Sequence, residues 1–428
     1  RSLLVTGVQT CALPISLLPF FITSANWAVL MAGSKGYNNY RHQSDIFNIY
    51  QILKSRGFDK DKIITIAYND VVDHEMNPIK GVIYNNKSHI NVYPGADAID
   101  YKGNDANAEN FMRVLLGDDK NGRALKTTEN DDLFIYYNDH GAPGLLCVPT
   151  HNGPLLYADQ IHKVLEEMHL KKKFRRIFFV IEACYSGSVA RNISVPNVFV
   201  LAAAGPAQSS YSADWDDDAQ AFLSNEFTKQ FVHYILEYPK EKIINAVNYI
   251  SQHVLRSHVT AFGDFRLTSL PLSAFLMNAK AVDFEANDDF DDNLEANTVQ
   301  TNNAFVDFLE RRTKSAHGIE KAKFGELLTK ERLRRNASSA IFNSIAKRIV
   351  PNGFEVDIND DFSDLIEYDC YRASVEGFRL FCGEVDEHEL PRLTYFIKLC
   401  KTTSKREILR QIQEACPKKL WEEEDLYV

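Results

Sequence analysis

The stretch IFFVIEACYSGS, residues 177–188, decides the fold expected for this chain. Its first five residues are large and apolar, which is typical of a strand buried on both faces of a sheet. The run ends on Glu182, Ala183 and Cys184, and small and polar residues follow. Ligands of open parallel sheets bind at the carboxyl ends of the strands. The sequence therefore predicts that the Cys184 thiol lies at the end of a buried strand, at the edge of the sheet where ligands bind.

Similar apolar runs alternate with amphipathic patterns throughout residues 26–282. The expected strands are 27–32, 63–67, 133–137, 177–181 and 198–204, and the clearest expected helices are 43–56 and 157–170. Strands that are apolar on both faces and separated by helices favour an α/β fold. We expect a mainly parallel sheet flanked by helices.

Length and charge narrow the class of protein. The chain has 428 residues, which exceeds one ordinary hydrophobic core and predicts two domains. The formal net charge of -10 argues against a nucleic-acid partner. No apolar run after residue 35 approaches the roughly 20 residues of a membrane-spanning helix, so no membrane span is expected.

The first 25 residues are not expected to belong to the fold. Residues 1–16 contain VTGVQTCALPIS, which resembles translated sequencing-adapter read-through, so this segment is interpreted as an artefact. Residues 17–25 are apolar and end on small residues, like the remnant of a signal peptide. The second segment predicts entry into the secretory pathway.

The composition changes after residue 282. Residues 283–303, DFEANDDFDDNLEANTVQTNN, contain seven acids and no base, which predicts an exposed acidic linker. Residues 304–428 contain no strand-like run and are expected to form a second, helical domain. Its first part, 301–350, is rich in bases, whereas 351–400 is rich in acids.

Four cysteines lie in this tail, at positions 370, 382, 400 and 416. An even number of clustered cysteines indicates two disulfides in an oxidising compartment, with three pairings open. A zinc site is the alternative, but the spacings contain no close C-x2-C pair. Sequons at Asn86, Asn192 and Asn336 would permit glycosylation in such a compartment.

A second expected strand also ends on reactive side chains, because 133–137 runs into Asn138-Asp139-His140-Gly141. If the two strands are parallel neighbours, His140 and Cys184 leave the sheet at the same edge. A thiol beside an imidazole is the arrangement of cysteine nucleophiles, which need neither metal nor cofactor. The N–H groups of Gly141 and Cys184 would stabilise an oxyanion. The alternative is an inert buried thiol and an ordinary loop histidine.

The motifs Tyr137–Gly141 and Glu182–Ser188 resemble those of the caspase-like cysteine peptidases, in particular the legumain family of asparaginyl endopeptidases. Residues 38–43 and 209–211 match two further motifs of that family, and the resemblance covers about residues 26–416. It implies a caspase-like fold with a six-stranded sheet. It also implies a helical C-terminal prodomain over the active site of a zymogen, in a lysosome-like compartment or outside the cell.

The resemblance assigns roles to further residues. It makes Asn39 the residue that orients His140. It places five side chains around the substrate's P1 residue: Arg41, His42, Glu182, Ser210 and Asn225. The family has an aspartate where this chain has Asn225, so either the asparagine replaces it or Glu226 supplies the charge. The resemblance also implies disulfides between Cys370 and Cys400 and between Cys382 and Cys416.

The implied partners are protein and peptide substrates, the chain's own prodomain as inhibitor, and cystatin-type inhibitors. Three functions stay open on the sequence alone. The first is hydrolysis after Asn, with Asp accepted at acid pH. The second is transfer of the same acyl-enzyme to an amine, as in peptide ligases and transamidases. The third is a non-catalytic binding protein on the same scaffold.

Charge in the tail suggests how the zymogen would respond to pH. We expect carboxylate–base pairs to hold the tail over Cys184, with the pKa values of those carboxylates depressed in the docked state. Protonation of the carboxylates would then release the tail on acidification. The linker contains five asparagines at which an asparagine-directed enzyme could cut itself: Asn287, Asn293, Asn297, Asn302 and Asn303.

Overall fold

The computed structural model describes residues 26–149, 153–278, 298–350, 356–357, 360–361, 364 and 366–416. The expected artefact at 1–16, the expected signal remnant at 17–25 and most of the expected linker lie outside these residues. No helix of the described residues is long and apolar enough to cross a membrane.

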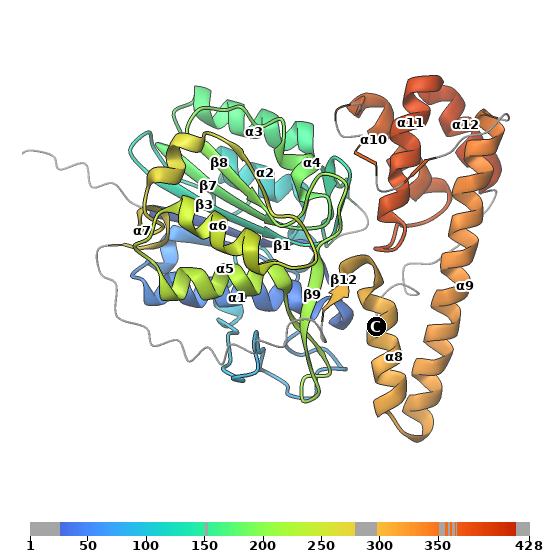
Figure 1. Cartoon of the computed structure of the whole chain (residues 1–428), viewed down its shortest axis with the longest axis horizontal. Helices are drawn as coiled ribbons and strands as arrows, with labels where there is room; N and C mark the ends of the chain where they lie inside the picture. Colours follow the sequence, from blue (N-terminus) through green and yellow to red (C-terminus); the bar gives the residue numbers. More distant parts are fainter. Residues whose placement is uncertain are drawn as a thin grey trace, which may run out of the picture.

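A six-stranded sheet forms the centre of the molecule, in the order β11-β8-β7-β3-β1-β2 (Figure 1). Five strands are mutually parallel, and β11 is an antiparallel edge strand. The bounds are β1 Asn26–Ala32, β2 Ile63–Ile66, β3 Asp132–Asn138, β7 Arg176–Glu182, β8 Val198–Ala202 and β11 Thr260–Gly263. The expected fold class is confirmed, and the five expected strands are all present.

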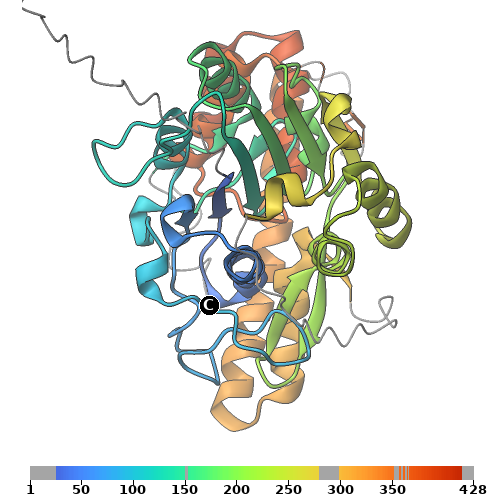
Figure 2. The same ribbon diagram turned by 90° about the vertical axis from the view of Figure 1, so that its left-hand side faces the viewer.

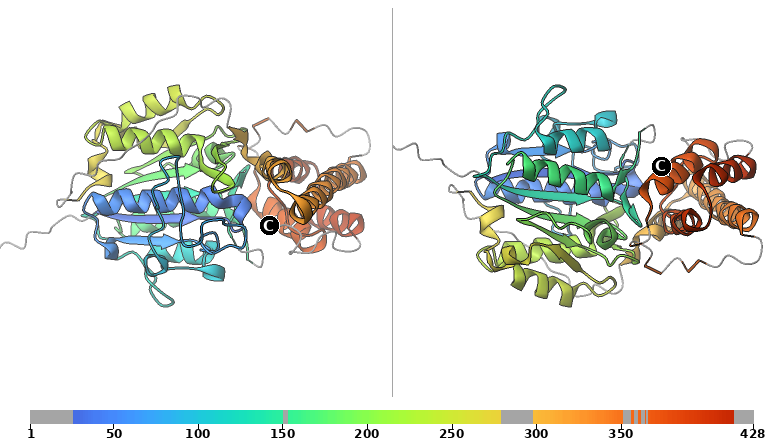
Figure 3. Two further views of the ribbon diagram at one scale, coloured as in Figure 1. Left: turned by 90° about the horizontal axis from the view of Figure 1, so that it is seen from below. Right: turned by 90° about the horizontal axis from the view of Figure 1, so that it is seen from above.

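Helices cover both faces of the sheet, because alternate residues of each strand point to opposite sides. In β1, Leu30 packs into the core on one face and Val29 into the core on the other. Figure 3 shows the first face in its left view and the second in its right view. The first face carries α1 Tyr40–Ser55, α5 Glu226–Glu237, α6 Ile243–His253 and α7 Ser273–Leu276, and the second carries α2 Ala108–Leu116 and α3 Ala158–Leu170.

Two smaller sheets complete the region around the strand ends. One has the order β10-β9-β12 and the other β4-β5-β6. Their bounds are β4 Gly141–Ala142, β5 Leu145–Leu146, β6 Leu156–Tyr157, β9 Tyr211–Asp216, β10 Ala221–Asn225 and β12 Val299–Gln300. Short 3-10 helices cover Tyr37–Asn39, Lys60–Lys62, Ala96–Ala98, Gly103–Asp105, Phe265–Ser269, Thr301–Asn303 and Leu390–Leu393.

The strand β12 corrects the expected linker. The sequence predicts an exposed segment as far as residue 303. Instead, Val299 and Gln300 pair with β9, and Thr301 is fully buried. The acidic composition that suggests a linker is confined to residues before 296, and the later residues can therefore enter the fold.

The C-terminal region is helical, as expected. It contains α8 Ala304–Ser315, α9 Gly318–Ile349, α10 Tyr368–Phe381, α11 Thr394–Thr402 and α12 Lys405–Ala415. Disulfides join Cys370 to Cys400 and Cys382 to Cys416. Figure 2, in which the side of the sheet domain that is turned away from the tail faces the viewer, shows α8 and α9 behind that domain.

The helices of the tail belong to two different cores. Phe305 and Phe308 of α8 pack into the core under α1 and α5, whereas Phe342, Phe378 and Phe396 lie in a second core, which contains the disulfides and also Leu145 and Tyr157 of the small β4-β5-β6 sheet. The first tail helix is therefore built onto the sheet domain.

Candidate active site

The carboxyl ends of β3 and β7 lie side by side, because these strands are parallel neighbours. Their last residues, Asn138 and Glu182, pair directly across the ladder. Just beyond them the Asp139 N–H donates to the Glu182 carbonyl at 3.0 Å. A Cβ atom added at Gly141 would lie 2.3 Å from the carbonyl oxygen of Cys184, so the approach requires glycine. The loop after β3 therefore runs directly beside Cys184.

Cys184 is 3% exposed and is followed by a sharp turn of the backbone. Tyr185 has φ 57°, in the left-handed region, and α4 Ser186–Ala190 begins immediately after it. The Cys184 Sγ atom accepts a hydrogen bond from the Ser210 N–H at 3.2 Å. Burial raises the pKa of the thiol, and the Ser210 donors act in the opposite direction. Uncovering the thiol would therefore favour the reactive thiolate.

The imidazole of His140 has its orientation set by Asn39. The Asn39 Oδ1 atom lies 2.8 Å from His140 Nε2, while the Asn39 Nδ2 group donates to the Lys35 carbonyl at 3.1 Å. With its amide oriented in this way, Asn39 accepts from an Nε2–H, and Nδ1 is left as the basic nitrogen. Burial, followed by the charge of Arg41, holds the pKa of His140 well below its usual range.

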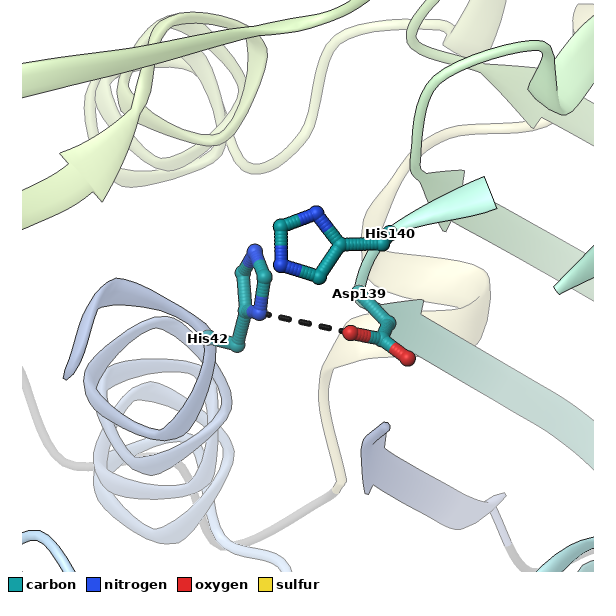
Figure 4. Close-up of side chains that lie close together, drawn as sticks. All are labelled: His42, Asp139 and His140. Atoms are coloured by element: carbon teal, nitrogen blue, oxygen red, sulfur yellow. Dashed lines mark ion pairs between the residues drawn. The ribbon is translucent and has the colours of Figure 1, made fainter. Parts of the chain in front are cut away.

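His42 and Asp139 form a buried cluster with His140 (Figure 4). His42 Nδ1 lies 2.7 Å from Ser34 Oγ and 3.4 Å from Asp139 Oδ1, and the two imidazole rings meet edge to face with centroids 4.9 Å apart. Burial raises the pKa of Asp139 and lowers that of His42. Donor atoms of the three side chains lie within 4.8 Å of one another and could hold a metal ion, although the sequence predicts none.

Arg41 is completely buried near the thiol. Its Nε donates to Asn225 Oδ1 and its Nη1 to the Asn38 carbonyl, both at 3.1 Å. Its Nη2 group is buried and has no hydrogen-bond partner among the described residues. The charge of a Cys184 thiolate would raise the pKa of Arg41, so the two groups are close enough to interact. A buried donor without a partner among the described residues therefore lies in the vicinity of Cys184.

Asp45 is a site residue that the sequence analysis missed. Its carboxylate accepts hydrogen bonds from four side chains, at 2.6–2.8 Å: Asn85, Asn138, Ser224 and Asn225. Burial raises its pKa to about 6, and these bonds act against the rise. The available signal was the spacing from Arg41, since residues four apart lie on one face of a helix.

The residue at position 225 is an asparagine, and its amide belongs to the hydrogen-bond network around Asp45. The Asn225 Nδ2 group donates to Asp45 at 2.8 Å and to Asn138 Oδ1 at 3.1 Å. Glu226, the alternative source of charge, instead accepts from the Leu255 N–H at 2.8 Å. The structure therefore places Asn225, and not Glu226, against the guanidinium of Arg41.

Glu182 supplies a second unsatisfied polar group near Ser210. Its Oε2 atom accepts from Thr228 Oγ1 at 3.4 Å, and its Oε1 atom is buried without a hydrogen-bond partner among the residues described. Burial, followed by the nearby charge of Asp45, raises the pKa of Glu182 to about 8. Below that pH the group is a neutral carboxyl that can both donate and accept.

The chain segment before α8 crosses this site. Gln300 pairs with Tyr211 in an antiparallel ladder, and the Thr301 N–H donates to the Ser210 carbonyl at 3.0 Å. Thr301 Oγ1 lies 3.4 Å from Ser210 Oγ, whose backbone N–H is bonded to the Cys184 sulfur. The segment therefore occupies the surface beside the thiol in the manner of an added strand.

The tail also reaches the imidazole. Glu387 Oε2 lies 3.4 Å from His140 Nε2, and Glu387 Oε1 accepts from the Phe305 N–H at 2.7 Å. Burial raises the pKa of Glu387, and the charges of Arg41 and Arg335 act against the rise. The expectation that docked carboxylates have depressed pKa values is therefore wrong for Glu387. Desolvation in this closed interface outweighs the attraction of the nearby bases.

Comparison with protein families matches residues 26–282 to the Peptidase C13 family. Hemoglobinase of Schistosoma mansoni is 36% identical over 58% of this chain and 58% of its own length. Legumain of Bos taurus is 28% identical over 88% of this chain and 89% of its own length. The vacuolar-processing enzyme delta-isozyme of Arabidopsis thaliana is 29% identical over 91% and 90%.

Among solved structures, caspase-1 of Spodoptera frugiperda aligns with 55% of this chain and 84% of its own, at 11% identity and a TM-score of 0.33. The family match covers the whole sheet domain, with both strand ends that carry His140 and Cys184. The chain belongs to the Peptidase C13 family and is a cysteine-type endopeptidase.

Proposed function

We propose that the enzyme hydrolyses peptide bonds on the carboxyl side of asparagine, and of aspartate at acid pH. The observation that carries this proposal is the pair of unsatisfied buried groups near the thiol, Arg41 Nη2 and Glu182 Oε1. An asparagine side chain has one acceptor and one donor. Its carbonyl would accept from Arg41 and its amide would donate to Glu182, so that both buried groups gain a partner.

In the proposed mechanism, Cys184 and His140 carry the chemistry. His140 Nδ1 takes the proton of the Cys184 thiol, the thiolate attacks the carbonyl carbon of the scissile bond, and the N–H groups of Gly141 and Cys184 stabilise the oxyanion. The C–N bond breaks as His140 Nδ1–H protonates the leaving amine. His140 then takes a proton from water, which attacks the thioester and releases the carboxylic acid product and the thiol.

The role of His42 in this proposal is indirect. It would line the wall of the P1 site while its hydrogen bond to Ser34 holds it beside Asp139. Ser210 would bind the substrate backbone, because its carbonyl already accepts from the Thr301 N–H at 3.0 Å.

The same proposal makes the chain a zymogen with three parts. These are a catalytic domain at 26–282, a linker at 283–303 whose last residues from Val299 onward are folded onto β9, and a prodomain at 304–428. Support comes from Thr301 and Glu387, which lie against Ser210 and His140 respectively. Cleavage at an asparagine of the linker would open the chain, and departure of these contacts would expose the thiol. Asn302 and Asn303 are the described candidates.

We assign the enzyme to an acidic compartment of the secretory pathway or to the exterior of the cell. Two disulfides in the tail require an oxidising environment during folding. Protein substrates, the prodomain and cystatin-type inhibitors are its proposed partners. The word "vacuolar" in the names of some relatives agrees with an acidic compartment.

The test is a library of peptides that differ only at P1, assayed with acid-treated full-length protein and with Cys184→Ser as control. Cleavage after Asn, and after Asp at acid pH, supports the proposal. Cleavage after Lys or Arg would contradict it. Adding a peptide amine and analysing the products by mass separates hydrolysis from transfer.

A further inference from the structure

We propose that this enzyme also takes a P1 aspartate as its ionised carboxylate, so that cleavage after Asp persists near neutral pH. The inference rests on the proposed function of the site. It follows from the amide at position 225 beside Arg41, and from how that amide is held.

The hydrogen bonds of Asn225 fix which of its atoms faces Arg41. Its Nδ2 group is used by Asp45 at 2.8 Å and by Asn138 at 3.1 Å. Its Oδ1 atom must then be the one that accepts from Arg41 Nε, at 3.1 Å. Asn225 therefore gives Arg41 the geometry of a carboxylate partner without its negative charge.

The charge near Arg41 is consequently less negative than an aspartate at 225 would make it. Four acids or thiols act on its guanidinium: Glu387, Cys184, Asp45 and Asp139. Glu387 belongs to the tail and would leave with it. Burial raises the pKa of both Asp139 and Cys184, which disfavours their anionic forms. Asp45, whose pKa burial raises to about 6, is an anion above that pH, and its carboxylate is then shared among four other side chains.

The other titratable neighbours add no negative charge. Burial, followed by the nearby charge of Arg41, lowers the pKa of both His42 and His140, and neither imidazole carries a negative charge in its neutral or protonated form. Glu182 is a neutral carboxyl below its pKa of about 8. A neutral carboxyl can donate to an oxygen of a carboxylate or accept from an amide. Arg41 Nη2 and Glu182 could thus offer two donors to an aspartate side chain, whose two oxygens accept both.

The ratio of kcat/KM for matched P1-Asp and P1-Asn peptides, measured from pH 4 to pH 7, tests this. The full-length chain is first processed until its active-site thiol titrates. If the site accepts only the neutral acid, the ratio falls about tenfold per pH unit above the Asp pKa of about 4. We expect a ratio that changes by less than about threefold between pH 5 and pH 7, because the carboxylate itself is bound.

The matched variants are Asn225→Asp and Asn104→Asp. The first restores a charge next to Arg41, and we expect its Asp/Asn ratio at pH 7 to fall on the order of tenfold or more. The second adds the same charge at an exposed residue and should leave the ratio unchanged. If Asn225→Asp does not fold, the wild-type profile still decides.

The outcomes separate the two proposals. A wild-type ratio that falls with the ionisation of Asp, while cleavage after Asn continues, overturns this inference and leaves the proposed function intact. Cleavage after neither residue, by protein whose thiol titrates, overturns both. An unchanged ratio in Asn225→Asp removes position 225 as the cause and overturns the inference.

Discussion

Asn39 Oδ1 lies 2.8 Å from His140 Nε2, although the two residues are 101 positions apart in the chain. This contact leaves His140 Nδ1 as the nitrogen available for proton transfer. The asparagine is itself fixed by the Lys35 carbonyl, so the orientation of the imidazole depends on a short, rigid chain of hydrogen bonds.

Replacing Asn39 by Ala should lower kcat by about 10- to 100-fold with little change in KM, because the imidazole loses its orientation but the substrate keeps its contacts. Steady-state kinetics on a P1-Asn peptide measures both constants. Asn104→Ala, which removes an exposed amide, is the control and should match wild type. A rise in KM alone would show that Asn39 binds substrate instead.

Replacing Cys184 by Ser should reduce turnover by more than about a thousandfold while the protein still folds, since the change is small and lies at a strand end. Cys147, the other free cysteine of the described residues, provides the matched control. Burial raises the pKa of the Cys147 thiol well above its usual range, so Cys147→Ser should keep both activity and labelling by a thiol-directed probe. Labelling that survives in Cys184→Ser and disappears in Cys147→Ser would reverse the assignment.

The pH response of the tail should come from histidines. Burial, followed by the charges of Arg335 and Arg392, lowers the pKa of His388 to about 4 in the docked state. A released tail would hold its proton nearer the usual pKa of about 6.5. Acidification from about pH 6.5 to pH 4 therefore favours the released state, which binds the extra proton, and docking is strongest above that range.

His388→Gln should accordingly reduce the acid-driven opening. The rate at which a thiol probe labels Cys184 at pH 4.5, relative to pH 6.5, should fall by on the order of tenfold. His317→Gln alters an exposed histidine of the same tail and should behave like wild type. Equal labelling in both variants would remove His388 from the switch.

Glu387 should shift the pH dependence of tail release in the opposite direction to His388. Its pKa is raised in the docked state, so the docked state gains the proton first and docking strengthens as the pH falls through the raised value. Glu387→Gln should remove this opposition and make labelling of Cys184 rise more steeply as the pH falls through the raised pKa of Glu387. A shallower rise would mean that the carboxylate holds the tail through charge, as the sequence first suggested.

The disulfides should stabilise the helices of the tail without affecting the stability of the six-stranded sheet. Cys370 and Cys400 are 30 positions apart, and a loop of that length contributes about 3–4 kcal/mol in the chain-entropy account. Replacing both by Ala should speed hydrogen exchange in α10 and α11 and leave β3 and β7 unchanged. Faster exchange in the sheet strands as well would show that the two cores unfold as one unit.

The sequence by itself determined the sheet and the chemistry at its edge. Short apolar runs favour strands buried on both faces, and such strands in alternation with helices favour a parallel sheet. His140 and Cys184 each follow the end of such a strand, and they leave at one edge because β3 and β7 are parallel neighbours. The pattern of apolar residues is visible in short stretches of sequence, and burial of apolar side chains favours such strands in any protein of this class.

Tertiary structure decided everything that depends on partners distant in the chain. Asp45 becomes a site residue only because Asn138 and Asn225 fold against it. The edge strand β11, the insertion of Thr301 beside Ser210 and the packing of α8 onto the sheet domain carry no local signal. The raised pKa of Glu387 also depends on tertiary structure. The sequence shows that the residue is an acid, but only the closed interface removes it from water and so raises its pKa.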